Sequence, residues 1–205
     1  RDVDRNSTEW KEEQDAARRL ALSNESLFDA PLSTIGNSDA AAVSRRLEQW
    51  VRADWPAPTG VLVSPLQRAL QTANITFAQI PGNRIHVREE LRERRTGLPC
   101  DDHSPPRDML RRPSFERMSW HHMLRGNSFM VNVVQRSAST GIKSHLIDRG
   151  VPAGLVEDNM ALRTRALQLI DVLLALPRAE LDGGGRVALG VVTHKGYLRE
   201  LERGL

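Results

Sequence analysis

Short runs of consecutive apolar residues alternate along this chain with longer segments of helical periodicity. The apolar runs are residues 61–63 and 187–192, of which the second is the stronger, and residues 85–87, with His86 between two apolar residues, are a further short strand candidate. Continuous apolar runs bounded by turn residues are typical of strands that are buried on both faces of a parallel sheet. The pattern therefore predicts three buried strands.

The segments between these runs have the composition and spacing of helices. Helices are predicted over residues 9–22, 39–51, 66–77, 158–176 and 197–201, the last of them beginning at Tyr197. Ser33 or Thr34 is a plausible N-cap before the second of these helices. Strands alternating with helices predict an α/β fold with a mostly parallel sheet. The apolar face of 39–51 is predicted to carry Ala42, Val43, Leu47, Trp50 and Val51, and that of 158–176 to carry Ala161, Leu162, Ala166, Leu169, Ile170, Leu173 and Leu174.

Residues 98–156 break this regular alternation. Their periodicity is weak, their polarity is mixed, and they contain several Pro and Gly residues. We interpret them as an irregular insertion with short helices. A length of 205 residues suits one domain over residues 1–205 that carries this insertion.

Composition narrows the functional classes. Lys and Arg number 29 and Asp and Glu 26, for a net charge of +3, which does not indicate nucleic-acid binding but suits an anionic small molecule. Cys100 is the only cysteine, so no intrachain disulfide is possible, and we expect a reducing, cytoplasmic location. No apolar run approaches the ~20 residues that a membrane-spanning helix needs, so no membrane association is expected.

Two residues with catalytic chemistry follow predicted strands. His194 comes directly after 187–192 and precedes Lys195 and Gly196, so its imidazole is expected at the sheet edge, where such folds bind ligands; a helix-capping role is the alternative. Arg68 lies in the first turn of a helix after 61–63, where a guanidinium and backbone N–H groups can bind phosphate; a solvated arginine is the alternative.

Other candidates carry weaker signals by themselves. Glu93 stands among arginines and could be an ordinary ion-pair partner or a proton donor. His121 and His122 are adjacent in a polar segment and are expected on the surface, with no third ligand at helical spacing for a metal.

Four segments in order resemble the histidine phosphatase (phosphoglycerate mutase-like) superfamily, branch 1. L-F-D-A-P-L-S-T-I-G resembles the D-x-x-L-T-x-x-G segment, and V-L-V-S-P-L-Q-R-A-L-Q-T-A resembles the second-arginine motif. V-R-E-E-L-R-E-R-R-T-G-L-P-C-D is similar to the L-x-E-x-x-x-G segment, and V-V-T-H-K-G-Y-L-R-E-L to the second-histidine motif.

This resemblance implies a three-layer α/β/α sandwich and a phosphohistidine mechanism. Arg68 would be the second phosphate-binding arginine, His194 the second histidine that stabilises the transferring phosphoryl group, and Glu93 the proton donor to the leaving group. Ser33, Lys195 and Gly196 would join Arg68 in binding the substrate. No cofactor or metal is implied.

The chain departs from the family pattern in one important respect, because no R-H-G motif occurs in it. The resemblance implies that the first strand and its nucleophilic histidine lie upstream of residue 1, and that the family fold continues beyond Leu205. Three milder departures are Ser33 in place of Thr, Lys195 in place of a small residue, and His103 at a position where relatives often have Arg.

Three functions remain open from the sequence. The first is phosphomonoester hydrolysis through phosphohistidine, on a phosphorylated small molecule or a phosphoprotein. The second is a phosphoglycerate mutase-type transfer, although L-R-E-R-R-T-G replaces the L-N-E-R-x-Y-G of mutases. The third is a catalytically inactive relative that binds a phosphorylated ligand or a protein. The oligomeric state is left open.

Overall fold

The central sheet consists of the three predicted strands. The computed structural model describes residues 7–80, 82–124, 156–174 and 188–203. Within them β1 (Pro58–Val63), β2 (Arg84–Val87) and β3 (Ala188–Val192) form one parallel sheet in the order β2-β1-β3. Leu62 of β1 is paired with His86 on one side and with Val191 on the other. The prediction of three parallel strands is confirmed, and residue 187 lies outside the described residues.

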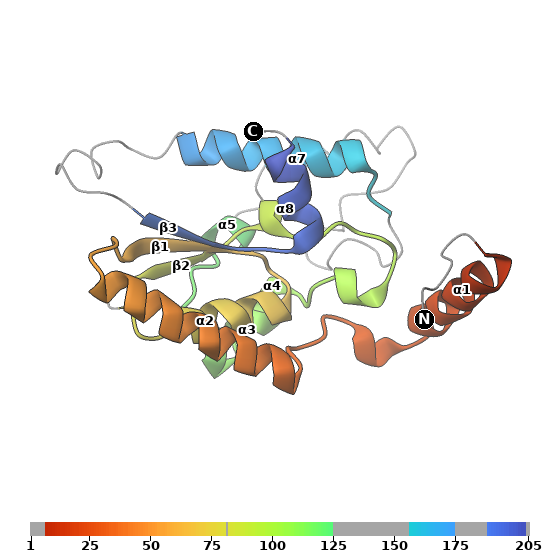
Figure 1. Cartoon of the computed structure of the whole chain (residues 1–205), viewed down its shortest axis with the longest axis horizontal. Coiled ribbons are helices and arrows are strands. Elements are labelled where there is room, and N and C mark those ends of the chain that lie inside the picture. The colour runs from red at the N-terminus through yellow and green to blue at the C-terminus, as the bar shows by residue number, and fades with distance from the viewer. Residues whose placement is uncertain (1–6, 81, 125–155, 175–187, 204–205) are drawn as a thin grey trace.

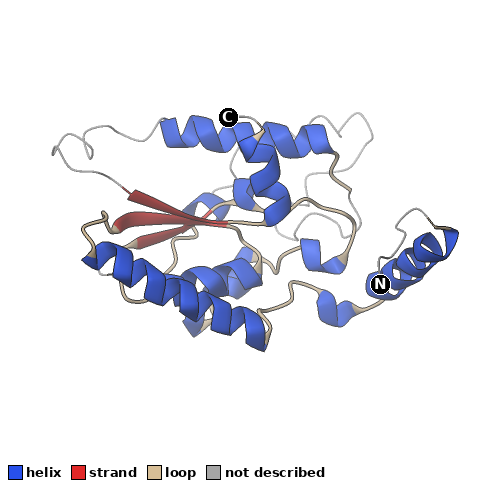
Figure 2. Ribbon diagram, in the orientation of Figure 1, coloured by secondary structure: helices blue, strands red, loops and turns tan. Residues whose placement is uncertain are grey.

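Helices cover both faces of this sheet. In Figure 1, α2 (Thr34–Arg52) and α3 (Gln67–Thr76) lie on one side, and α7 (Asn159–Leu174) and α8 (Lys195–Glu202) lie on the other. Figure 2 shows the same three layers by secondary structure. The predicted α/β sandwich is therefore confirmed.

Side chains alternate across the central strand and build a separate core on each face. Val61 and Val63 are fully buried in the core that contains Leu70 of α3. Leu62 between them faces the opposite core, with Leu162 of α7. Because β1 is buried on both faces, an uninterrupted apolar run is the pattern that it requires.

Helix α2 is longer than predicted, and its buried face is different. It begins at Thr34 because the Ser33 hydroxyl caps it by accepting a hydrogen bond from the Gly36 N–H at 3.1 Å. Ala42, Val43 and Trp50 were predicted on the buried face, but Ala42 is exposed and the other two are about half exposed. The residues that face inward at helical spacing are Ala40, Ser44, Leu47 and Val51. Trp50 instead lies 6.0 Å from the Arg46 guanidinium.

Helix α7 confirms the predicted stripe only in part. Leu162, Ala166 and Leu169 are buried, but Ala161 is exposed. The stripe also contains Arg165, whose side chain is fully buried. Residues 175 and 176 of the predicted helix lie outside the described residues.

The described part of the irregular insertion consists of short helices, as predicted. They are η3 (Pro99–Asp101), α4 (Pro106–Leu110), η4 (Pro113–Phe115) and α5 (His121–Leu124), after η2 (Glu89–Leu91). Residues 125–155 lie outside the described residues.

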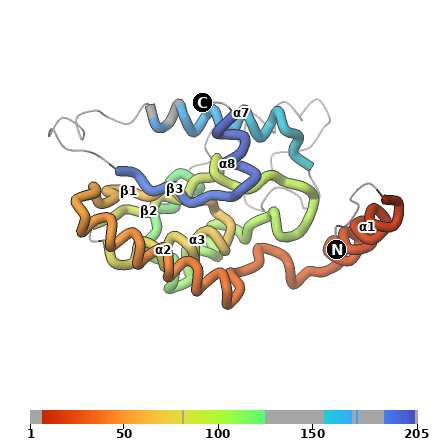
Figure 3. The backbone as a smooth tube through the Cα atoms, viewed as in Figure 1, coloured from red at the N-terminus to blue at the C-terminus, as the bar shows by residue number. Residues whose placement is uncertain are grey.

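The N-terminal helix contributes nothing to either core. The tube in Figure 3 shows α1 (Thr8–Leu22) apart from the sheet, joined to α2 through η1 (Glu25–Leu27). No residue of α1 is buried, and its Arg18 guanidinium donates a hydrogen bond to the Thr96 carbonyl.

Candidate functional site

The carboxyl ends of β1 and β3 lie side by side and deliver two polar side chains to one edge of the sheet. The Ser64 N–H, directly after β1, donates to the Val192 carbonyl at 3.0 Å. The chain then turns into α3, whereas after β3 it passes through Thr193 to His194 and α8. Parallel strands therefore bring together residues that are 130 positions apart in the sequence.

His194 is buried and is held against Ser64. Its Nε2 atom lies 2.8 Å from Ser64 Oγ. Because α8 begins at Lys195, two residues earlier than predicted, His194 occupies the N-cap position, yet its side chain makes no capping hydrogen bond. The imidazole is thus directed toward Ser64 at the sheet edge and does not cap α8.

The electrostatic surroundings keep the His194 ring neutral. Burial lowers its pKa from 6.5 to about 3, and the positive charges of Arg68, Arg165 and Arg92 contribute further. A neutral imidazole near guanidinium groups can contact a phosphoryl oxygen. A bound anion would raise the pKa of the ring again, because its negative charge favours the protonated form.

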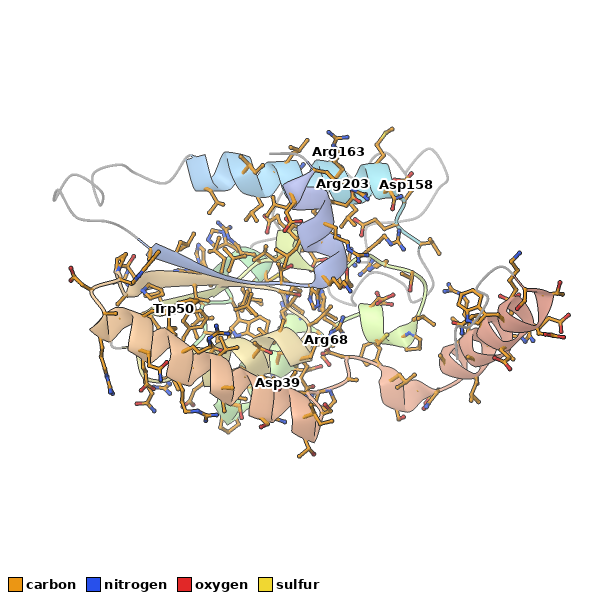
Figure 4. The ribbon with its side chains drawn as sticks, in the orientation of Figure 1. Asp39, Trp50, Arg68, Asp158, Arg163 and Arg203 are labelled. Carbon is orange, nitrogen blue, oxygen red and sulfur yellow. The ribbon has the colours of Figure 1, made fainter. Side chains whose placement is uncertain are left out.

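Arg68 reaches this edge from the first turn of α3 (Figure 4). Its Nη1 atom donates to the Cys100 carbonyl at 2.7 Å. In the described part of the chain its guanidinium makes no ion pair with a carboxylate, so its charge is uncompensated. The Gln67 N–H at the start of α3 is already bonded to Asp29 Oδ1 at 2.7 Å, so this one donor of the helix terminus is not free for a ligand.

Glu93 is positioned by the first turn of α8. The Arg94 N–H donates to Glu93 Oε1 at 2.9 Å. A Cβ atom added at Gly196 would lie 2.6 Å from the same oxygen, so a residue without a side chain is required for this approach. Both residues border an open cavity of about 490 Å³, a volume in the range of small-molecule sites. The cavity is also lined by Arg94, Thr96, Leu98, Asp101, Asn159, Leu162, Arg199, Glu200 and Arg203.

Ser33 and Lys195, the remaining predicted binding residues, do not line this cavity, and neither do Arg68 and His194. Ser33 is exposed, and its hydroxyl caps α2. Lys195 is exposed as the first residue of α8. Their roles in substrate binding stay predictions.

A buried arginine that sequence reasoning missed supports the segment carrying Glu93. The Arg165 Nε and Nη2 atoms donate to the two carboxylate oxygens of Glu157, at 3.0 and 2.7 Å. Its Nη1 atom donates to the carbonyls of Glu90 and Arg92, at 2.9 and 2.6 Å. One guanidinium from α7 therefore holds the backbone immediately before Glu93 in place.

A second set of ion pairs lies beside Arg165 and shares Glu157 with it. Arg92 Nε donates to Glu89 Oε1 at 2.8 Å, and its Nη2 atom lies 3.6 Å from Glu157 Oε2. Glu89 Oε2 lies 3.0 Å from His103 Nε2. Burial lowers the pKa of His103, but the Glu89 carboxylate outweighs this and the net pKa is raised. We call Glu89, Arg92, His103, Glu157 and Arg165 the paired network.

Comparison with known proteins decides the family. The model of the histidine phosphatase superfamily (branch 1) matches residues 8–140, which is more than half of the chain. The chain belongs to this superfamily. The matched region contains Arg68 and Glu93 and ends before His194. A search of curated proteins found no match.

Membership in the histidine phosphatase superfamily confirms the resemblance and supports phosphoryl transfer by way of histidine in general. In the described part of the chain, no three His, Cys, Asp or Glu side chains gather as a possible metal site. None of the described helices has the length and apolar character needed to cross a bilayer.

Proposed function

We propose that this protein is a phosphomonoesterase that works through a phosphohistidine intermediate. The observation that carries the proposal is the convergence of Arg68 and His194 at one sheet edge, with no carboxylate pairing either of them in the described residues. Phosphoryl transfer depends on positioning and on neutralising charge at the phosphoryl oxygens. The Arg68 guanidinium supplies the charge, and the His194 ring supplies a hydrogen-bonding partner.

Glu93 protonates the leaving oxygen in this proposal. Its carboxyl borders the 490 Å³ cavity, which gives the leaving group a place to lie. The nucleophile would be a histidine of the R-H-G motif that the resemblance implies, which residues 1–205 do not contain. It attacks phosphorus as the ester oxygen departs with the proton from Glu93, and water then attacks the phosphohistidine and releases inorganic phosphate.

Hydrolysis is favoured over mutase chemistry because of the Glu93 segment. Its sequence is L-R-E-R-R-T-G, and the mutases carry Asn before the Glu and Tyr before the Gly. Here those positions are Arg92, which belongs to the paired network, and Thr96, whose hydroxyl is bonded to Asp101 at 2.5 Å.

The test uses the full-length protein with phenyl phosphate and with a phosphoglycerate. Release of inorganic phosphate from phenyl phosphate supports a phosphatase, and isomerisation of the phosphoglycerate without release supports a mutase. Saturable phosphate binding with neither reaction supports an inactive relative. We expect Arg68→Ala and His194→Ala to lower kcat/KM by about 10²- to 10³-fold, and the exposed control Arg163→Ala to leave it unchanged. Full activity in both site variants would exclude this site.

A further inference from the structure

Arg88 is a buried cation that neither the fold nor the proposed function uses. It follows the last residue of β2, and its N–H donates to the Val63 carbonyl at 2.9 Å. The residue is only 9% exposed. Its Nε atom is buried without a hydrogen-bond partner, and no described carboxylate forms an ion pair with it.

The position of Arg88 places it on the same edge as the phosphoryl site. Val87 points into the core shared with Val63. Because Arg88 continues in extended conformation, its side chain projects to the opposite face, the face on which Ser64 follows Val63. Arg88 is therefore one strand from Ser64 and two strands from His194, a backbone separation of ~10 Å.

Two imidazoles lie near enough to Arg88 for its charge to act on them. His86 lies two residues earlier on β2, and His122 lies on α5, which packs beside β2. Burial, followed by the charge of Arg88, lowers the pKa of each ring. Glu90 acts on His122 in the opposite direction, but it makes no ion pair with Arg88. The group thus consists of the Arg88 guanidinium, two neutral imidazoles and the nearby Glu90 carboxyl, which forms no ion pair with Arg88.

A buried and unpaired guanidinium is strongly unfavourable unless something compensates its charge. In the paired network, Glu89 and Glu157 compensate Arg92 and Arg165. No described residue forms an ion pair with Arg88, so an anion bound beside the guanidinium would compensate its charge.

We propose that Arg88, with His86 and His122, binds a second anionic group of the substrate, a carboxylate or a second phosphate, while the reacting phosphoryl group lies at Arg68 and His194. This inference rests on the proposed function, because it assumes that a phosphomonoester occupies the His194 end of the edge. The separation along the edge suits a substrate whose two anionic groups lie at opposite ends of a small molecule.

The test compares 4-carboxyphenyl phosphate with 4-carbamoylphenyl phosphate, which differ in one charge and hardly in shape. We expect the wild-type protein to prefer the carboxylate, and Arg88→Gln to reduce the ratio of the two kcat/KM values by about 10- to 100-fold. Phenyl phosphate should be hydrolysed equally well by both proteins. Arg84→Gln is the matched control, because Arg84 is an exposed arginine of the same strand. 1,4-Phenylene bisphosphate tests whether a phosphate replaces the carboxylate.

Each remaining outcome decides one of the two proposals. Hydrolysis of phenyl phosphate with a preference that survives in Arg88→Gln would overturn the second site and leave the phosphatase intact. If none of the esters is hydrolysed, the phosphatase proposal fails, and calorimetric binding of the two compounds by wild type and Arg88→Gln tests the anion site alone.

Thermal unfolding gives a further check. Arg88→Met should have an unchanged or higher Tm, whereas a clear fall would show that Arg88 serves only the fold.

Discussion

The surroundings of two buried histidines, His103 and His194, shift their pKa values in opposite directions. The His103 ring lies 3.0 Å from the Glu89 carboxylate within the paired network, and its pKa is raised. Among the described side chains, His194 is hydrogen-bonded only to the Ser64 hydroxyl, and burial together with nearby arginines lowers its pKa to about 3. Both rings are about equally inaccessible, at 9% exposure, so burial does not explain the difference. The Glu89 carboxylate beside His103 explains the difference between the two pKa values.

The same contrast holds for the arginines around them. Arg92 and Arg165 are matched by Glu89 and Glu157, and they hold the backbone that leads to Glu93. Arg68 has a carbonyl partner but no carboxylate. The ion pairs of Arg92 and Arg165 thus stabilise the segment that carries Glu93. Arg68 at the sheet edge has no described carboxylate partner, as the proposed anion site requires. The predictions below separate these two roles.

The largest expected effect is on stability and comes from breaking the paired network. Glu157→Gln leaves the fully buried Arg165 without its carboxylate, so we expect the free energy of unfolding to fall by about 3–5 kcal/mol. Urea denaturation measures this loss. Glu202→Gln, on the exposed side of α8, is the control. A loss no larger than that of the control would show that the network does not hold the fold.

The next effect concerns the position of Glu93. Gly196→Ala places a Cβ atom 2.6 Å from Glu93 Oε1, so the carboxylate must move. We expect kcat to fall by about 10- to 100-fold. Gly60→Ala is the control, because its nearest neighbour would be a flexible leucine atom at 3.4 Å. Normal kcat in Gly196→Ala would exclude Glu93 as the proton donor at its present position.

The pH dependence of stability distinguishes the two histidines by sign. His194 has a lowered pKa, so the unfolded state binds the proton first, and stability falls as the pH drops from 6.5 toward about 3. His103 has a raised pKa, so its contribution is present below 6.5 and is lost as the pH rises through the folded-state value. We expect His194→Asn to flatten the acid side of the profile and His103→Gln to lower stability most at acid pH. Unfolding measured from pH 4 to 8 checks this, and identical profiles for the two variants would refute it.

The smallest effect is at Ser33. Removing its hydroxyl from the N-cap of α2 should lower the free energy of unfolding by about 1 kcal/mol. The hydroxyl hydrogen remains available to a substrate, so KM also rises if the predicted substrate role holds. Ser38→Ala within α2 is the control. An unchanged KM in Ser33→Ala would leave the cap as the only role of Ser33.

The strands could be predicted from the sequence because both faces of β1 are buried and leave an uninterrupted apolar run. His194 and Arg68 could be placed at one edge because parallel strands end together. The paired network could not be predicted, since Arg165 is an arginine within an apolar helical stripe and its partners depend on tertiary packing. Ser64 was not singled out as a site residue, because its contact with His194 depends on the register of β1 and β3. Val43 and Trp50 were misplaced because apolar residues at the flank of a helical stripe fit the same periodicity.

The most direct test of an open phosphoryl site is an NMR titration of the full-length protein with inorganic phosphate at pH 7. It follows the ring nitrogen resonances of His194 and His103. The account predicts that the His194 resonances shift with saturable dependence on phosphate, that the shift disappears in Arg68→Ala, and that the His103 resonances stay in place. His194 resonances that do not move at high phosphate, or that move equally in Arg68→Ala, would contradict it.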